Sequence, residues 1–436
     1  MGLSFGTDGV RGVANTQLTP AFALDLGRVA ARRLGSATIV VARDTRRSGT
    51  MLEAAFAAGA ASEGATVQLL GEVPTPAVAH VCRVLGAAGA MVSASHNPFA
   101  DNGIKLFGVG GRKLTDDAER AISAGLQSLG EPTRSGGDVG TVLDGSSLVG
   151  HYVEFLAGAL HGRSLAGLRI VIDAANGAAS GLAASVFEQA GAAVSIVAAS
   201  PNGVNINEGC GATHPTMLAE AVRTQGADLG LALDGDADRL IAVDQSGNVV
   251  DGDQVMAVLA IDMRARQVLR HDTVVVTVMT NLGFRHAMRR EGIAVVDTAV
   301  GDRYVLDALE AGDYSLGGEQ SGHVIARDLA GTGDGMLSGL LLADAVVRSG
   351  RPLAGLAGVM QRLPQVLVNV RMAERDPTVL ERLAPAISEA EAELGDEGRV
   401  LVRASGTEPV VRVMVEAPTD DKARTIAHRL GALIAT

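Results

Sequence analysis

The sequence predicts an α/β protein with three related α/β sandwich domains built on mixed sheets, followed by a smaller C-terminal α+β domain. The first observation is a pattern that recurs three times: a strand, a polar or glycine-containing turn, an apolar helix, a glycine and a second strand. The second is a change after about residue 366, where a strand, a helix, two strands and a helix follow one another. Because a helix that joins two strands typically forms a right-handed βαβ unit, each recurrence predicts an α/β domain.

The three copies differ in how closely they match. The first strand of each copy is apolar, and these strands are expected at 39–42, 169–172 and 273–279. They lead, in the same order, into the turns RDTRRSG, DAANGAASG and TNLGF. The strand that closes each copy follows a glycine, and these strands are expected at 66–70, 193–197 and 294–297. The third copy is the loosest match. We therefore predict four domains, with limits at 1–154, 155–255, 256–365 and 366–436.

Composition excludes several classes of protein. The chain has 436 residues, of which 47% are hydrophobic and 20% charged, as in globular proteins of several domains. A net charge of −12 argues against a nucleic-acid partner, since phosphate backbones attract surplus Lys and Arg. Cys82 and Cys210 are isolated and form no disulfide framework or Cys-x-x-Cys metal site, as expected in a reducing compartment. Without a targeting signal or about 20 consecutive apolar residues, we expect a cytoplasmic protein with no membrane partner.

Four polar loops place reactive side chains among glycines. In the first, MVSASHNPFADNG, an apolar run ends in Ser95, His96 and Asn97. A serine in such a loop can act as a nucleophile when a base, a metal or a preorganised electrostatic setting activates it. The same residues are also typical of an ordinary Asn-Pro turn, so the loop alone does not decide between these readings.

The second loop, LALDGDADRL, carries Asp234, Asp236 and Asp238 at alternate positions after an apolar strand. Their mutual repulsion is costly unless a cation lies among them, and oxygen ligands suit Mg²⁺ or Ca²⁺. An EF-hand requires Gly and Glu where this chain has Arg239 and Gln245, which argues against a calcium sensor. Three carboxylates leave the coordination shell open, as Mg²⁺ requires when phosphate oxygens complete it. A solvated acidic turn is the alternative.

The third loop, GGEQSGH, carries Glu319, Ser321 and His323 between glycines. Carboxylate and hydroxyl groups bind sugar hydroxyls through hydrogen bonds and reject analogues that leave a buried partner unmet. We predict hydroxyl recognition here, although an ordinary polar turn explains this loop equally well.

The fourth loop, RASGTEP, joins two expected strands. Backbone and hydroxyl donors of Ser405, Gly406 and Thr407 can converge on an oxyanion, while Arg403 and Arg412 can form charge-assisted pairs with phosphate. The chain contains no Walker A sequence, which disfavours a nucleoside triphosphatase. A simple hairpin is the alternative.

Together the loops supply a nucleophile, a metal site, a hydroxyl site and a phosphate site, as phosphoryl transfer to and from a sugar requires. SASHNP, DGDADR, GEQSGH and RASGTEP, in this order, resemble the motifs of the α-D-phosphohexomutase family over essentially the whole chain. FGTDGVRG, NGVNINEGCGATHP, VGDRYV and Gln320 are most similar to its bacterial phosphoglucosamine mutase branch. A phosphomannomutase or phosphoglucomutase, a sugar phosphatase and a non-catalytic sugar-phosphate-binding protein remain as alternatives.

The resemblance implies roles for individual residues, with Ser95 as the phosphoserine and Lys105 and His323 as acid and base candidates. It places one Mg²⁺ per chain on Ser95, Asp234, Asp236 and Asp238. It implies these catalytic residues: Ser95, His96, Lys105, Arg11, Arg239 and His323. It implies these substrate-binding residues: Glu319, Ser321, His323, Arg403, Ser405, Gly406, Thr407 and Arg412.

The resemblance also implies a reaction. Glucosamine 6-phosphate and glucosamine 1-phosphate would be interconverted through phosphoserine and a 1,6-bisphosphate, feeding UDP-N-acetylglucosamine and peptidoglycan synthesis. Glucosamine 1,6-bisphosphate or a similar bisphosphate would act as activator, and the only partner implied is a small hexosamine phosphate. The domains would surround a central cleft that the C-terminal domain opens and closes. A monomer and a homodimer are equally compatible with the sequence.

Overall fold

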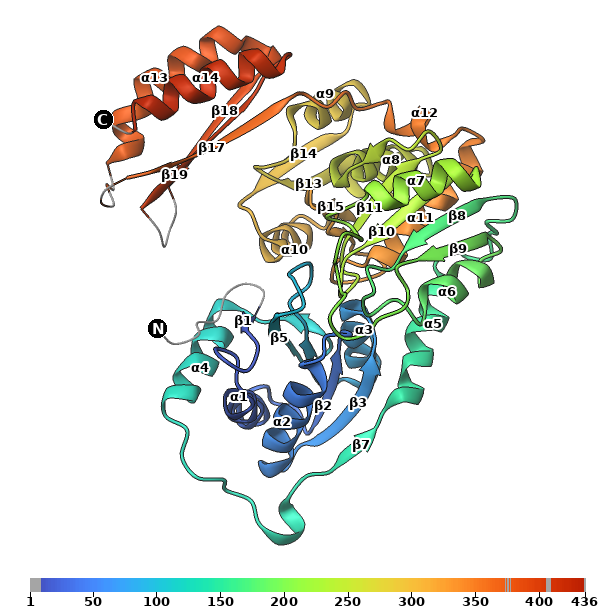
Figure 1. Ribbon diagram of the computed structural model, residues 1–436, viewed down its shortest axis with the longest axis vertical. Helices are drawn as coiled ribbons and strands as arrows, with labels where there is room; N and C mark the ends of the chain where they lie inside the picture. Colours follow the sequence, from blue (N-terminus) through green and yellow to red (C-terminus); the bar gives the residue numbers. More distant parts are fainter. Residues whose placement is uncertain (1–8, 373, 375, 377, 405–408, 435–436) are drawn as a thin grey trace. The chain divides into compact units, whose positions relative to one another are not determined.

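The computed structural model describes residues 9–372, 374, 376, 378–404 and 409–434, which form four β-sheets (Figure 1). The first three sheets combine parallel and antiparallel strand pairs, and the fourth is antiparallel throughout. The predicted fold class of three α/β domains and a smaller α+β domain is confirmed. The chain divides into two compact units, which comprise residues 1–278 with 294–357, and 279–293 with 358–436. The four predicted domain limits stay predictions.

The first sheet has the order β1-β5-β4-β2-β3-β7, with β6 paired to β5. Its strands are β1 (Val10–Val13), β2 (Thr38–Arg43), β3 (Thr66–Glu72), β4 (Ala88–Val92), β5 (Asp101–Gly108), β6 (Arg112–Lys113) and β7 (Val142–Asp144). Its helices are α1 (Pro20–Arg33), α2 (Gly49–Ser62), α3 (Thr75–Leu85) and α4 (Asp116–Gln127). Figure 1 shows α1 and α2 on one face of this sheet and α3 on the other.

Helices α1 and α2 pack unusually closely because glycines lie at their contact. A Cβ atom on Gly27 would lie 2.1 Å from the Phe56 carbonyl oxygen, and one on Gly59 would lie 2.0 Å from that of Leu24. Any larger residue at these positions would push the two helices apart. Helix α1 begins at Thr19, whose side chain accepts a hydrogen bond from the Phe22 amide and so satisfies a free N–H group of the first turn.

The second sheet has the order β12-β11-β10-β8-β9. Its strands are β8 (Arg169–Asp173), β9 (Ala193–Val197), β10 (Leu229–Leu233), β11 (Leu240–Asp244) and β12 (Val249–Val250). The helices of this region are α5 (Val149–Gly158), α6 (Ala183–Gln189) and α7 (Thr216–Gln225). Leu218 and Val222 of α7 join the core that includes Val171 and Val243 of this sheet.

The third sheet has the order β14-β13-β15-β16. Its strands are β13 (Thr273–Thr277), β14 (Ala294–Thr298), β15 (Leu316–Gly318) and β16 (Val324–Ala326). The helices of this region are α8 (Gly252–Ala265), α9 (Leu282–Arg290), α10 (Asp302–Ala311), α11 (Gly335–Ser349) and α12 (Leu353–Ala357). Val305 and Leu309 of α10 pack against Val275 and Ile325 of the sheet, which fixes where α10 begins relative to the strands.

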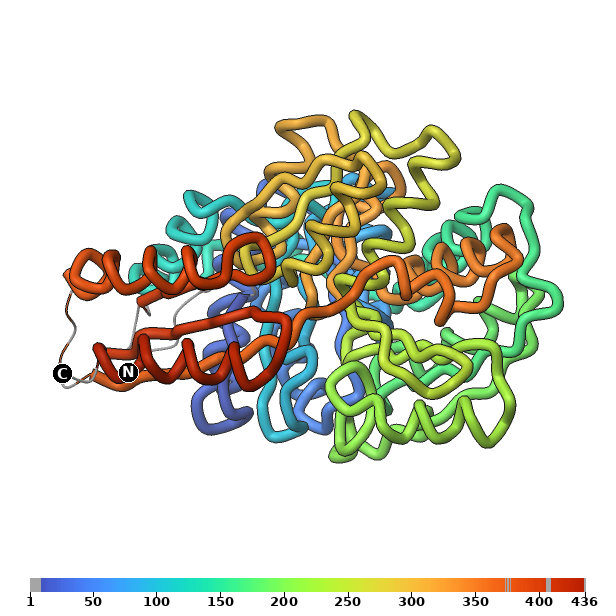
Figure 2. The backbone as a smooth tube through the Cα atoms, turned by 90° about the horizontal axis from the view of Figure 1, so that it is seen from above, coloured from blue at the N-terminus to red at the C-terminus, as the bar shows by residue number. Residues whose placement is uncertain are grey.

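The fourth sheet has the order β17-β19-β18, with strands β17 (Gln365–Arg371), β18 (Arg399–Ala404) and β19 (Val410–Glu416). Helices α13 (Val379–Leu394) and α14 (Asp420–Ala432) lie side by side on one face of it (Figures 1 and 2). Their buried residues form one core with the strands, which includes Leu383, Ile426 and Val413.

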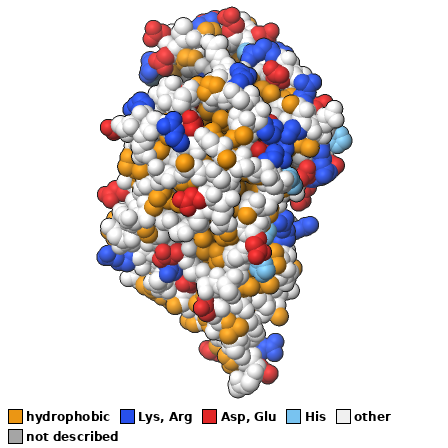
Figure 3. All heavy atoms as spheres, turned by 90° about the vertical axis from the view of Figure 1, so that its right-hand side faces the viewer, with side chains coloured by type: hydrophobic (Ala, Val, Ile, Leu, Met, Phe, Trp, Pro, Cys, Tyr) orange, Lys and Arg blue, Asp and Glu red, His pale blue; other side chains and the backbone are white. Residues whose placement is uncertain are grey.

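No helix among the described residues is both long and apolar enough to span a membrane. Figure 3 shows one face of the molecule, on which acidic and basic side chains are interspersed. The negative net charge is therefore not gathered into a single patch on this face.

Candidate active site

Three of the four polar loops begin directly where a strand ends. The Ser95 loop follows β4, the aspartate loop follows β10, and the GGEQSGH loop joins β15 to β16. In α/β sheets, ligands typically bind beyond the carboxyl ends of the strands. This placement brings side chains from the first three sheets together within one compact unit.

Ser95 is buried and its backbone is strained. None of its surface is exposed, and its φ angle of +53° lies in the left-handed region, which costs a residue other than glycine about 1–3 kcal/mol. Its Oγ atom donates a hydrogen bond to Asp234 Oδ2 at 2.5 Å and lies 3.4 Å from Nδ1 of His96. The structure therefore brings the predicted nucleophile against the predicted metal ligands.

The three aspartates form a buried cluster that fits a hard cation. Asp234, Asp236 and Asp238 are 1%, 0% and 6% exposed, and each offers a carboxylate oxygen within 4.8 Å of the others. One oxygen of Asp236 and one of Asp238 are buried without a hydrogen-bond partner. Burial, followed by the charges of the other two carboxylates, raises the pKa of Asp234 to about 8. A divalent cation would supply the missing partner and relieve this repulsion.

Lys105 is the main counter-charge of the cluster. Its Nζ atom lies 2.6 Å from Asp236 Oδ2 and 3.1 Å from Asp238 Oδ2, and the side chain is buried. Burial alone would raise the pKa of Asp238, but the Lys105 ammonium group, together with His323 and Arg239, holds it well below its usual value. Thr75 also contacts the cluster, because its hydroxyl donates to Asp236 Oδ2 at 2.5 Å.

Arg11, His96 and Arg239 surround this centre. The Arg239 amide donates to Asp234 Oδ1 at 3.2 Å, and its guanidinium Nε lies 3.7 Å from Asp238 Oδ1. Burial lowers the pKa of His96, and the positive charges of Arg239 and Arg11 lower it further. His96 is therefore held largely neutral, and the two arginines add positive charge beside it.

The five residues between β15 and β16 form a tight hairpin turn that separates the predicted sugar-binding residues. His323 is 3% exposed, its Nε2 atom accepts a hydrogen bond from the Gly333 amide, and its Nδ1 atom lies 3.8 Å from Asp238 Oδ2. Glu319 is half-buried and accepts a hydrogen bond from the Gly301 amide, while Ser321 is exposed. His323 thus lies with the aspartate cluster, whereas Ser321 is exposed to solvent.

The strands that flank the predicted phosphate loop, β18 and β19, belong to the second compact unit. Arg403 on β18 and Arg412 on β19 are directly opposite each other in the antiparallel register. Burial lowers the pKa of Arg403, and the charge of Arg412 adds to this. Like charges in this position destabilise a sheet, and a bound anion would neutralise them. Ser405, Gly406 and Thr407 lie outside the described residues.

Sequence reasoning missed several contacts at the site. Thr75 was overlooked because it lies 161 residues from Asp236 in the chain. Asp302, at the start of α10, was also overlooked, although its Oδ2 atom lies 3.3 Å from His323 Nε2 and it pairs with Lys113. The VGDRYV motif that contains Asp302 was the available signal.

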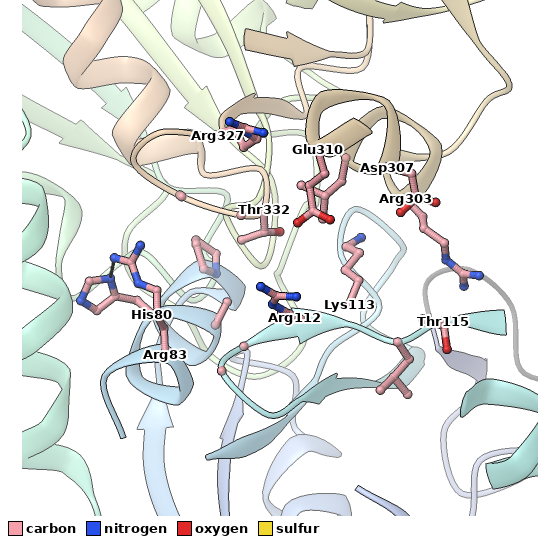
Figure 4. Close-up of a pocket in the computed structure, with 18 of the residues that line it drawn as sticks. His80, Arg83, Arg112, Lys113, Thr115, Arg303, Asp307, Glu310, Arg327 and Thr332 are labelled. Atoms are coloured by element: carbon pink, nitrogen blue, oxygen red, sulfur yellow. Dashed lines mark hydrogen bonds between the residues drawn. The ribbon is translucent and has the colours of Figure 1, made fainter. Parts of the chain in front are cut away.

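A cavity of about 640 Å³ lies between α3, the β5–β6 hairpin and α10 (Figure 4). Arg112 and Lys113 of the hairpin face Asp307 and Glu310 of α10 across it. Arg303 also lines the cavity and pairs with carboxylates of α4. Six basic and five acidic side chains line the cavity, so its formal charges nearly balance.

Models of the four phosphoglucomutase/phosphomannomutase domains match the chain in order. The α/β/α domains I, II and III match residues 2–132, 151–247 and 251–363, and the C-terminal domain matches 367–432. The chain belongs to the phosphoglucomutase/phosphomannomutase family. The predicted resemblance to the phosphohexomutases is thereby confirmed.

Relatives in this family resemble the chain over its whole length. Proteins named phosphoglucosamine mutase from Streptomyces griseus and Corynebacterium jeikeium are 53% and 52% identical to it. The alignments cover 100% of this chain in both cases, and 99% and 100% of the relatives.

Solved structures of family members share the fold. A phosphoglucomutase/phosphomannomutase family protein from Burkholderia thailandensis matches with a TM-score of 0.81 and 25% identity, covering 99% of this chain and 98% of that one. An N-acetylphosphoglucosamine mutase from Aspergillus fumigatus, in complex with GlcNAc-6P and magnesium, matches with a TM-score of 0.70 and 19% identity, covering 100% and 96%. At that identity the second match supports the fold alone.

Proposed function

We propose that the chain is a phosphoglucosamine mutase, an isomerase that interconverts glucosamine 6-phosphate and glucosamine 1-phosphate. The observation that carries this proposal is the buried Ser95 hydroxyl, which lies 2.5 Å from Asp234 within the acidic cluster. A serine held in this way can carry a phosphoryl group between two positions of a sugar. The choice of glucosamine rests on the relatives that are more than half identical over the whole chain.

The acidic cluster fits one Mg²⁺ per chain, held by Asp234, Asp236 and Asp238 together with an oxygen of Ser95 or its phosphate. The buried oxygens of Asp236 and Asp238 that lack a hydrogen-bond partner support this fit. When bound, the ion supplies positive charge that neutralises the transferring phosphoryl group.

The chain's own residues position the reactants and handle the proton. The bond between phosphorus and Ser95 Oγ breaks while a sugar hydroxyl oxygen bonds to the phosphorus, which yields a 1,6-bisphosphate. Ser95 Oγ gains a proton as it leaves, and the sugar hydroxyl gives up its proton. Lys105 and His323 are our candidates for the acid and the base because both are buried beside the cluster. Arg11, His96 and Arg239 lie around the phosphoserine and stabilise its charge.

The bisphosphate must then reorient within the site so that its other phosphate can be transferred to Ser95. We assign the phosphate that is not reacting to Arg403 and Arg412, together with the loop that carries Ser405, Gly406 and Thr407. Backbone donors and arginines bind a phosphate without requiring one sugar orientation, as this exchange demands.

We assign the sugar hydroxyls to the turn that carries Glu319, Ser321 and His323. The bisphosphate would also activate the enzyme by phosphorylating Ser95. A cytoplasmic location and a place before UDP-N-acetylglucosamine formation stay predictions.

The test is conversion of glucosamine 6-phosphate with Mg²⁺ and a trace of glucose 1,6-bisphosphate. Ser95→Ala should lower the rate by at least about 10³-fold because the phosphate carrier is gone. Ser147→Ala changes an exposed serine of a short surface helix and should leave the rate unchanged. Undiminished conversion by the Ser95→Ala protein would overturn the mechanism.

Parallel reactions separate the alternatives. Faster conversion of mannose 6-phosphate or glucose 6-phosphate would mean that the glucosamine assignment is wrong. Release of inorganic phosphate in place of the 1-phosphate would indicate a phosphatase. Because Ser95 has no exposed surface, we expect water to compete poorly with the sugar hydroxyl.

A further inference from the structure

Two side chains from distant parts of the chain hold the backbone of the Ser95 loop. Arg46 Nη2 donates to the carbonyl oxygens of Ser95 and Asn97, at 2.8 Å each. Asn207 Nδ2 donates to the same two oxygens, at 2.9 and 3.1 Å. Arg46 follows β2 in the first sheet region, whereas Asn207 lies between β9 and α7 in the second. We call this pair the carbonyl clamp.

Arg46 is committed to this loop. It is 1% exposed, and its Nη1 atom donates to the carbonyl oxygens of Asp101, at 3.0 Å, and Pro98. Its charge is balanced by Asp44, whose Oδ2 atom lies 2.8 Å from Arg46 Nε. A buried arginine whose donors are used in this way has little freedom to serve a substrate.

The amide side of Ser95 is fixed as well. Asp44 Oδ2 accepts a hydrogen bond from the Ser93 hydroxyl at 2.6 Å, and Ser93 Oγ in turn accepts one from the Ser95 amide at 2.9 Å. Ser95 is therefore held at both its N–H and its C=O group. This double restraint explains how a serine persists in a left-handed conformation.

The aspartate loop packs against the same carbonyl. A Cβ atom on Gly235 would lie 2.5 Å from the Ser95 carbonyl oxygen and 2.9 Å from Asn207 Nδ2. Only glycine allows this approach. The clamp thus lies where the loop that carries Ser95 meets the loop that carries the aspartates.

We propose that Arg46 and Asn207 are positioning residues that fix Ser95 Oγ, and the phosphate it carries, against the aspartate cluster. The proposal rests on the proposed function, because it names residues that orient the same nucleophile. Both residues act through the backbone of the loop. The clamp also gives a role to two motifs outside the four polar loops, RDTRRSG and NGVNINEGCG.

Asn207→Gly is the most direct test. Asn207 has a φ angle of +59°, which glycine adopts freely, so the change removes the amide without straining the backbone. We expect kcat to fall by about 10- to 100-fold, since an error of about 1 Å in placing a reacting group has this effect. KM for glucosamine 6-phosphate and the dissociation constant of Mg²⁺ should change by less than about threefold, because the hydrogen bonds of the Asn207 amide go to backbone carbonyls of the loop.

Two further variants keep the test decisive. Asn202→Gly removes an exposed side-chain amide of the same segment. Among the described residues, that side chain accepts a hydrogen bond only from the backbone amide of Val204. The variant should behave like wild type. Arg46→Lys keeps a positive charge beside Asp44 but loses the planar group that serves several carbonyls at once. It should repeat the loss of kcat, and it decides the matter if Asn207→Gly does not fold.

Amide hydrogen exchange of residues 95–101 gives a readout that does not depend on activity. Exchange should be faster in Asn207→Gly than in wild type or Asn202→Gly, and the increase should be confined to this loop. An unchanged kcat would overturn the positioning role. So would a fall in kcat that comes with an equally large rise in KM, weaker Mg²⁺ binding and lower thermal stability. If wild type lacks mutase activity, the proposed function fails instead, and unchanged exchange in Asn207→Gly would then overturn the clamp as well.

Discussion

Asp334 should make the stability of the protein depend on pH in an unusual direction. The residue is 1% exposed and caps α11, where its Oδ1 atom accepts a hydrogen bond from the Leu337 amide at 2.9 Å. Its Oδ2 atom accepts one from the Tyr152 hydroxyl, also at 2.9 Å. Burial nevertheless raises the pKa of Asp334 from 3.8 to about 6, because these hydrogen bonds only partly offset the loss of solvation.

The size of the effect follows from this pKa. The folded state binds the proton more tightly than the unfolded state, so stability is lost as pH rises from about 3.8 through 6. The shift of about 2 pH units corresponds to about 3 kcal/mol. Asparagine keeps the helix cap through its carbonyl oxygen, and its NH2 group can donate a hydrogen bond to the Tyr152 hydroxyl oxygen, without the charge. The free energy of unfolding of Asp334→Asn should therefore rise by about 2–3 kcal/mol relative to wild type between pH 4 and pH 7.

Chemical denaturation at a series of pH values, at constant Mg²⁺, measures this difference. Asp344→Asn is the matched control, because Asp344 lies on the same helix and is held by Arg163 and Arg348. Burial alone would raise the pKa of Asp344, but the hydrogen bonds from the two arginines hold it below its usual value. Its carboxylate therefore does not titrate between pH 5 and 7. Parallel curves for wild type and Asp334→Asn would refute the reasoning.

Two other predictions concern the metal site and the thiols. Asp236→Asn should lower Mg²⁺ affinity by at least about tenfold in calorimetric titration. Asp117→Asn changes an exposed carboxylate and should leave the affinity unchanged. If Asp236→Asn binds Mg²⁺ as tightly as wild type, the cluster is not the metal site. Cys82 and Cys210 are buried, and burial raises their pKa values to about 12 and about 11, so a thiol reagent should label them only after unfolding. Rapid labelling of the native protein would contradict their burial.

The sequence predicted the parts of the site that local patterns encode. An apolar strand was predicted directly before Asp234, and the structure places Asp234 immediately after the buried strand β10. The apolar run ahead of the Ser95 loop is also a buried strand, β4. The apolar runs RVLVRAS and VVRVMVE likewise predicted β18 and β19. These features depend on neighbouring residues, so one sequence is enough to reveal them.

Contacts between distant segments could not be predicted in this way. Arg46 and Asn207 reach the Ser95 carbonyl across 49 and 112 residues of chain. Their partners are backbone atoms, which every residue possesses, so the sequence offers no complementary side chain to search for. The pairing of Arg403 with Arg412 depends on strand register, which also needs the fold.

The left-handed backbone at Ser95 sets the role proposed for this residue against its conformational preference. Glycine would adopt this φ angle without strain, so backbone conformation alone would favour glycine over serine at this position. Under the proposed function serine is required despite this strain, because glycine has no hydroxyl that could carry a phosphate. The groups that hold the loop lie in separate stretches of the sequence, so a substitution far from Ser95 in the chain would disturb its backbone without changing the serine itself.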